Sequence, residues 1–137
     1  VFMAETPREL QSRLLQSNFL VYILDGDQVR KGLSLDLDFS KKGKQENVRR
    51  IGEVAKLFVD AGFITGVATI SPSQRDRNYV RDIFSPGPFI EVHLECPLKE
   101  CERRDVKCLY KRARNGEVLD FTGISSPYDP PPHQPRD

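Results

Sequence analysis

The sequence has few of the residues that bind zinc or form disulfides. Its cysteines are Cys96, Cys101 and Cys108, an odd number without a CxxC pair, and its histidines are His93 and His133. This supply gives no complete ligand set for zinc, and it favours reduced thiols in an intracellular protein. We therefore expect no disulfide, and we expect any bound metal to be Mg²⁺ held by oxygen atoms.

The sequence also lacks an excess of charge and a long apolar run. The 21 lysines and arginines nearly cancel the 20 aspartates and glutamates, so the net charge of +1 gives no general attraction to nucleic acid or membranes. No membrane-length run or leader is visible, so we expect a cytoplasmic protein without membrane or nucleic-acid partners. With 137 residues, 38% of them hydrophobic, residues 1–137 should form one domain.

Strand and helix patterns alternate along the chain. The predicted strands are the β-rich apolar runs 19–24, 64–70 and 89–96. The predicted helices are 6–17, which starts with a capping box at Thr6, and 46–61, which ends before Gly62, with further helices after the second and third strands. This order predicts an α/β fold with a parallel β-sheet flanked by helices. The proline-rich residues 125–137 should form an irregular terminal loop.

Two carboxylates follow the first predicted strand. In Asp25-Gly26-Asp27 they stand beside a residue that allows close approach of the backbone, an arrangement that suits Mg²⁺ binding and removal of a proton from a hydroxyl. An ordinary polar turn is the alternative. Ligands of parallel sheets bind beyond the carboxyl ends of the strands, which predicts that Asp25, Asp27 and Ser71 lie on one rim.

Around this acidic pair, the sequence resembles the adenylylsulfate kinase (APS kinase) family. The matches run in the family's order from about Val21 to Tyr128. They are residues 24–33, 46–58, 70–72, 75–77, 89–92, 101–105, 109–114 and 121–124. The resemblance implies a P-loop nucleoside-kinase-like fold. It also implies transfer of the γ-phosphate of ATP to the 3′-hydroxyl of adenosine 5′-phosphosulfate (APS), which forms 3′-phosphoadenylylsulfate in sulfate assimilation.

The resemblance further implies roles for individual residues. Asp25 and Asp27 would serve Mg²⁺ and the acceptor hydroxyl, with Asp27 favoured as the base although the two roles could be exchanged. Phe39 and Phe121 would stack on the adenine of APS, and Arg30 would bind its phosphosulfate. The other substrate-binding residues would be Lys44, Asn47, Ile70 and Ser71. The alternatives are core packing for the phenylalanines, a surface ion pair for Arg30 and a helix cap for Asn47.

A basic segment would close over the transferring phosphate as a lid. In this segment the resemblance makes Lys111 catalytic and assigns nucleotide contacts to Arg104, Arg112 and Arg114, because cations near the developing charge favour phosphoryl transfer. An exposed basic helix is the alternative. The implied partners are ATP and APS, and the resemblance leaves open a homodimer and a fusion to, or association with, ATP sulfurylase.

One departure from the family bears on function. The phosphate-binding motif GxxxxGK[ST] does not occur in these residues, and Lys44 stands where the family usually has arginine. Because Val1-Phe2-Met3 resembles the family's first strand, we expect that the loop segment after about residue 3 and the elements that close the fold are missing from this sequence. The missing motif favours a second reading, a regulatory APS-kinase-like domain that binds the product nucleotide without catalysis. The retention of Asp25 and Asp27 opposes that reading.

Overall fold

The computed structural model describes residues 6–105 and 107–132. The elements follow one another as α1 (Thr6–Gln16), β1 (Val21–Asp25), α2 (Gly26–Arg30), α3 (Lys41–Asp60), β2 (Ile64–Ala68), α4 (Gln74–Ile83), α5 (Leu98–Arg104) and α6 (Leu109–Arg114). Of the helices in the described ranges, none combines the length and apolar character that crossing a membrane requires.

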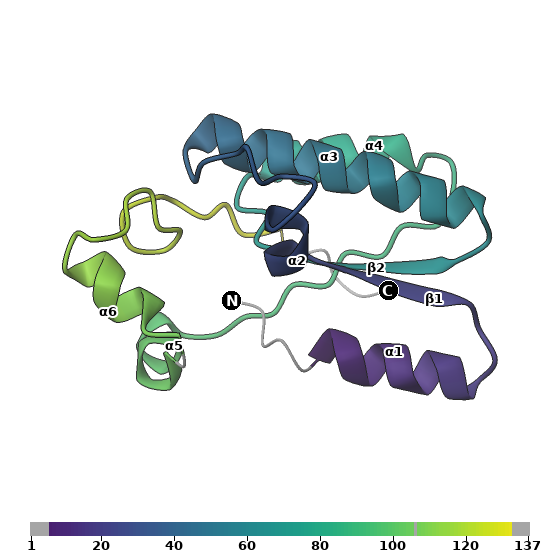
Figure 1. Cartoon of the computed structure of the whole chain (residues 1–137), viewed down its shortest axis with the longest axis horizontal. Coiled ribbons are helices and arrows are strands. Elements are labelled where there is room, and N and C mark those ends of the chain that lie inside the picture. The colour runs from purple at the N-terminus through teal and green to yellow at the C-terminus, as the bar shows by residue number, and fades with distance from the viewer. Residues whose placement is uncertain (1–5, 106, 133–137) are drawn as a thin grey trace.

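A parallel pair of strands forms the centre of the molecule. β1 and β2 pair in register from Val21 with Ile64 to Asp25 with Ala68, so both strands end at the same edge. Figure 1 shows α1 on one side of the pair, and α3 and α4 on the other. The prediction of an α/β fold with a parallel sheet flanked by helices is confirmed.

The core lies between the sheet and α3. Its buried cluster contains Leu24 of β1, Val29 of α2, and Ile51 and Ala55 of α3. The apolar residues of α3 recur at helical spacing and therefore face the sheet together. Burial of this face fixes α2, which directly follows β1, against α3.

Two sequence predictions need correction. The helix predicted from residue 46 begins five residues earlier, at Lys41. The Ser40 hydroxyl accepts the N–H of Gly43 and so caps the helix at this earlier start. The strand predicted at 89–96 is wrong, since no strand of the described residues pairs with it. Side chains hold this segment instead: Glu91 forms ion pairs with Arg77 and Arg81 of α4.

The last described elements, α5 and α6, form a unit of their own. We call residues 98–105 and 107–114 the lid unit, and Figure 1 shows it beside the end of the sheet where the strands stop. Residues 127–132, in the described part of the proline-rich tail, contain no regular helix or strand. The segment Val1-Phe2-Met3 lies outside the described residues.

Candidate functional site

The carboxyl ends of β1 and β2 form the centre of the site. One oxygen of Asp25 accepts the N–H groups of Asp27 at 2.8 Å and Gln28 at 3.3 Å, and so caps α2. A Cβ on Gly26 would lie 3.0 Å from the Thr69 hydroxyl oxygen and 3.2 Å from the Ala68 carbonyl oxygen. Glycine therefore lets the chain leave β1 in contact with the end of β2.

Lys107 of the lid unit reaches this edge. Its ammonium donates to the exposed carboxylate of Asp27, and the pKa of Lys107 is raised chiefly by Asp27, with a further contribution from Asp25. The sequence predictions did not include Lys107. It is one of several basic residues in its segment, and its partner lies 80 residues away, so no local pattern points to it.

α2 links the carboxylates to a basic and aromatic group. Asp27 and Arg30 are three residues apart on this helix and therefore share a face. The Arg30 guanidinium donates to the carbonyl oxygens of Leu37 at 3.1 Å and Asp38 at 3.2 Å, and it lies 4.2 Å from the centre of the Phe39 ring. Burial lowers the pKa of Arg30, and Asp38 partly offsets this effect. Phe39 is 58% exposed, so core packing does not explain it.

Lys44 of α3 holds the loop that carries Phe121. Its ammonium donates to the carbonyl oxygen of Asp120 and to the Thr122 hydroxyl at 3.2 Å. The pKa of Lys44 is lowered, mainly by burial, and Asp120 partly offsets this shift. The positive charge of Arg30 lowers the pKa of Lys44 further, which shows that Lys44 and Arg30 are near each other. Lys44 thus brings the loop of Phe121 toward the face of α2 that holds Arg30.

Asn47 is buried in α3, one turn after Lys44, and is 4% exposed. It lies inside the helix, so the alternative reading as a helix cap is wrong: Ser40 is the cap. The side-chain carbonyl oxygen of Asn47 is buried and has no hydrogen-bond partner among the described residues. A buried oxygen of this kind is costly unless a water or a bound molecule donates a hydrogen bond to it.

The residues after β2 are held by a buried arginine that the sequence predictions left without a role. The Arg77 guanidinium, 8% exposed, donates to the carbonyl oxygens of Ser71 at 2.6 Å and Asp129 at 2.5 Å. Ile70, directly before Ser71, is 49% exposed. The structure therefore fixes the backbone of Ser71 at the predicted rim and leaves Ile70 open to solvent.

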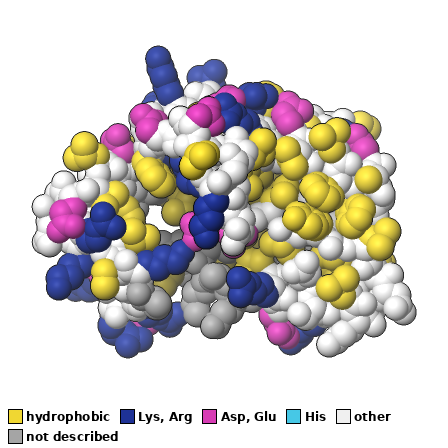
Figure 2. All heavy atoms as spheres, viewed as in Figure 1, with side chains coloured by type: hydrophobic (Ala, Val, Ile, Leu, Met, Phe, Trp, Pro, Cys, Tyr) yellow, Lys and Arg dark blue, Asp and Glu magenta, His cyan; other side chains and the backbone are white. Residues whose placement is uncertain are grey.

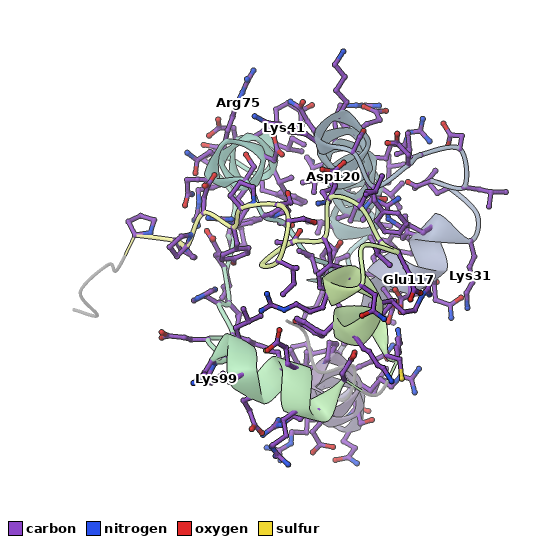
Figure 3. All side chains as sticks on the ribbon, turned by 90° about the vertical axis from the view of Figure 1, so that its left-hand side faces the viewer. Lys31, Lys41, Arg75, Lys99, Glu117 and Asp120 are labelled. Atoms are coloured by element: carbon purple, nitrogen blue, oxygen red, sulfur yellow. The ribbon has the colours of Figure 1, made fainter. Side chains whose placement is uncertain are left out.

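The predicted lid residues are engaged mainly within the lid unit and its neighbouring loop. Arg104 pairs with Glu100 at 2.5 Å, Arg112 with Glu117 at 3.2 Å and Arg114 with Glu102 at 2.7 Å. Lys111 is exposed on α6. Figure 3 looks onto this side, with Lys99 at one end of α5 and Glu117 and Asp120 beyond α6. In the described parts of the chain, no hydrogen bond or ion pair joins Lys111, Arg112 or Arg114 to the sheet-edge carboxylates.

The sheet edge fits a divalent cation only in part. Within the described ranges, no group of three His, Cys, Asp or Glu side chains is placed to hold a metal. Asp25 and Asp27 nevertheless supply two carboxylates, one of which already attracts the Lys107 ammonium. Mg²⁺ is usually bound by one or two carboxylates together with substrate phosphates and water, so Asp25 and Asp27 would supply only part of its ligands.

Comparison with known proteins shows close relatives. A family model described as adenylylsulphate kinase matches residues 5–135. A probable adenylyl-sulfate kinase of Halalkalibacterium halodurans is 55% identical over 122 residues, which are 89% of this chain and 60% of the relative. An adenylyl-sulfate kinase of Staphylococcus haemolyticus is 54% identical over 128 residues, which are 93% of this chain and 64% of the relative.

A solved structure agrees with these matches. The Mycobacterium tuberculosis APS kinase CysC in complex with AMPPNP and APS has a TM-score of 0.87 and 43% identity, over 90% of this chain and 72% of that chain. The chain spans about 60% of the length of the first curated relative. Since the family model covers nearly all of the residues, the chain belongs to the adenylylsulfate kinase family.

Proposed function

We propose that this protein transfers the γ-phosphoryl group of ATP to the 3′-hydroxyl of APS, forming 3′-phosphoadenylylsulfate. The observation that carries the proposal is the acidic pair at the end of β1, found in a chain of this family. Asp25 is occupied as the cap of α2, whereas the Asp27 side chain is 68% exposed. Asp27 is therefore the better candidate for the base, and Asp25 for the residue that orients α2.

The acceptor nucleotide would bind between α2, α3 and the loop of Phe121. Phe39 and Phe121 would stack on its adenine, and the buried amide oxygen of Asn47 would accept a hydrogen bond from it. Arg30 and Lys44 bring two neighbouring positive charges, which suit the phosphosulfate. Ile70 and Ser71 would form the rim on the β2 side.

Asp27 would accept the proton of the attacking hydroxyl as its oxygen bonds to phosphorus. A carboxylate paired with Lys107 is a weaker base, so we propose that Lys107 releases Asp27 when the substrates bind. Asp25 and Asp27 would hold Mg²⁺, which supplies positive charge to the transferring group. Lys111, Arg104, Arg112 and Arg114 would then contribute from the lid unit.

The test is the replacement Asp27→Asn in protein whose intact mass shows that it carries the phosphate-binding loop. This change keeps the shape but removes the base, so ATP-dependent formation of 3′-phosphoadenylylsulfate should fall by roughly a hundredfold or more. Asp60→Asn is the matched control, because Asp60 pairs with Lys56 at the far end of α3. The control should retain full activity.

The second candidate is a regulatory domain that binds the product nucleotide without catalysis. The observation in its favour is that GxxxxGK[ST] does not occur in these 137 residues. Protein that binds the product, shows no ATP-dependent phosphorylation and is unaffected by Asp27→Asn would establish this reading. The cytoplasmic location stays a prediction from the composition, and a homodimer and an association with ATP sulfurylase stay predictions from the resemblance.

A further inference from the structure

Residues 31–40, which we call the α2–α3 loop, carry Phe39 toward the proposed acceptor site. The loop leaves α2 after Arg30 and runs back along α3 to the start of that helix (Figure 1). The backbone N–H groups of Ser34, Leu35 and Leu37 donate to carbonyl oxygens at most five positions earlier in the chain. These hydrogen bonds shape the loop locally, so its attachment to α3 depends on side chains.

One arginine of α3 makes that attachment. The Arg50 guanidinium donates to both carboxylate oxygens of Asp36, at 2.6 and 2.9 Å, and to the Leu33 carbonyl oxygen at 2.8 Å. Its Nε donates at 2.9 Å to Glu46, one turn earlier on α3. The four hydrogen bonds use four of the five N–H donors of a guanidinium, which leaves little capacity for a direct contact with substrate.

The loop packs closely against the body at the residues that Arg50 holds. Ser34, which follows Leu33, is 1% exposed, whereas Leu35 beside it is 74% exposed. An arginine that binds both oxygens of one carboxylate fixes the direction of the contact as well as its distance. Arg50 and Asp36 therefore determine how the loop lies on α3.

The contacts of Arg50 end where those of Arg30 begin. Arg30 donates to the carbonyl oxygens of Leu37 and Asp38, the two residues after Asp36, and lies against the Phe39 ring. We propose that Arg50 is a positioning residue for the acceptor nucleotide, which holds the α2–α3 loop so that Phe39 and Arg30 are in place before the nucleotide binds. This inference rests on the proposed function, which assigns both residues to APS.

The expected consequence concerns affinity for the acceptor. A loop that is ordered before binding spares the nucleotide the cost of ordering it, so loss of the contact weakens binding of APS. ATP and the transfer step do not use Phe39. Because Asp36 is 62% exposed, the contact is partly screened by solvent, and the effect should be smaller than that of removing Phe39 itself.

The test compares two neighbouring arginines in protein that carries the phosphate-binding loop. Arg50→Met should raise the KM for APS roughly threefold to tenfold and leave kcat and the KM for ATP unchanged. Arg49→Met is the matched control, because Arg49 binds the same Glu46, at 2.8 and 2.9 Å, within α3. The control should keep all three constants. An unchanged KM for APS in Arg50→Met, or an equal rise in the KM for ATP, would overturn the proposal.

The partner of Arg50 gives the same test from the side of the loop. Asp36→Asn removes the carboxylate charge at an exposed position, so it tests the contact even if Arg50→Met does not fold. It should raise the KM for APS in the same direction. Where both single variants fold, the double variant should show no larger rise than Arg50→Met alone, since the two changes remove one contact. Fully additive effects would show that Arg50 and Asp36 act separately, and would contradict the proposal.

Hydrogen exchange follows the loop without requiring catalysis. In Arg50→Met the amides of Leu35 and Leu37 should exchange several times faster, while that of Ala55 in the core of α3 stays protected. If the unchanged protein lacks kinase activity, the proposed function fails, and calorimetric titration with APS then tests Arg50 alone. Weaker binding of APS by Arg50→Met than by Arg49→Met would support the role of Arg50, and equal binding would overturn it.

Discussion

Different interactions stabilise the sheet body and the lid unit. The sheet body, which comprises β1, β2, α2, α3 and α4, is built around a buried apolar cluster. The lid unit buries only Cys101, Tyr110 and Ala113 among its described residues, and an ion pair between Arg114 and Glu102 joins its two helices. Exposed ion pairs contribute at most about 1 kcal/mol each. We therefore expect the body to be the more stable of the two regions.

The surface shows the same division. In Figure 2, Lys and Arg side chains gather over the end with α5 and α6, and hydrophobic side chains gather over the opposite end. The described contacts from the lid unit and the following loop to the body include Lys107 with Asp27, and Lys44 with the loop of Phe121. Both contacts are polar and both lie at the candidate site, so substrates can change how the two regions meet.

The largest expected effect comes from the core of the body. Ile51→Ala removes a side chain that is 2% exposed, and it should lower the free energy of unfolding by about 2–5 kcal/mol. Leu57→Ala, on the same helix at 68% exposure, is the control and should change it by less than about 1 kcal/mol. Urea unfolding followed by circular dichroism measures both. Equal effects would show that α3 does not carry the body's core.

The second prediction tests how the body holds its rim. Arg77 Nε and Glu91 Oε1 form an ion pair at 3.0 Å, but their geometry is not that of a hydrogen bond. The other two guanidinium nitrogens of Arg77 donate to the carbonyl oxygens of Ser71 and Asp129. Arg77→Met should lower the free energy of unfolding by about 2–3 kcal/mol. This loss is smaller than that usually seen when one partner of a buried ion pair is removed, because Arg81 still neutralises Glu91.

An exposed arginine of the same helix is the control for Arg77. Figure 3 shows Arg75 pointing away from the molecule, so Arg75→Met should leave unfolding nearly unchanged. Chemical denaturation of the two variants side by side makes the comparison. If both unfold like the unchanged protein, Arg77 does not organise the rim.

Local patterns predicted the body well and failed where partners are distant. The apolar spacing of α3 and the alternation of strands and helices are short-range signals, and both were confirmed. The run 89–96 has the residues of a strand, but a strand also needs a neighbour with free backbone groups, which composition does not reveal. The start of α3 was misplaced because the cap at Ser40 was not considered.

The third prediction concerns two aromatic residues, one from the body and one from the loop that follows the lid unit, which would contribute to one site. Phe121→Ala should weaken APS binding by about 1–3 kcal/mol, the usual contribution of a stacked base, and Phe39→Ala should do the same. Phe19→Ala is the control, since Phe19 is an exposed aromatic before β1. Isothermal titration calorimetry measures the affinities. Unchanged affinity in both site variants would remove the clamp.

The site was predictable only through family motifs and strand ends. The carboxylates of Asp25 and Asp27 follow a strand and could be found from that position alone. Lys107 and Arg77 could not, because their partners lie 80 and 52 residues away in the sequence. The roles of the predicted substrate-binding residues stay predictions, although the unpartnered oxygen of Asn47 and the exposed ring of Phe39 favour them.

The smallest expected effect is confined to the lid unit and depends on Asp105. Its carboxylate accepts the backbone N–H groups of Tyr110 at 3.1 Å and Lys111 at 3.0 Å, and so holds the first turn of α6. Burial alone would raise the pKa of Asp105, but the backbone N–H groups of Lys111, Tyr110 and Leu109 together lower it below its ordinary value of 3.8. A carboxyl with a lower pKa in the folded state stabilises that state above its unfolded pKa.

This stabilisation should be lost as the pH falls from about 3.8 through the folded pKa of Asp105. Amide NMR during acid titration should therefore show the signals of Tyr110 and Lys111 changing before those of Ile51 in the core. Asp105→Asn should produce the same local change at neutral pH and leave Ile51 unaffected, whereas Asp82→Asn, an exposed change on α4, should alter neither. If Ile51 changed together with Tyr110, the lid unit and the body would unfold as one, and the distinction between them would fail.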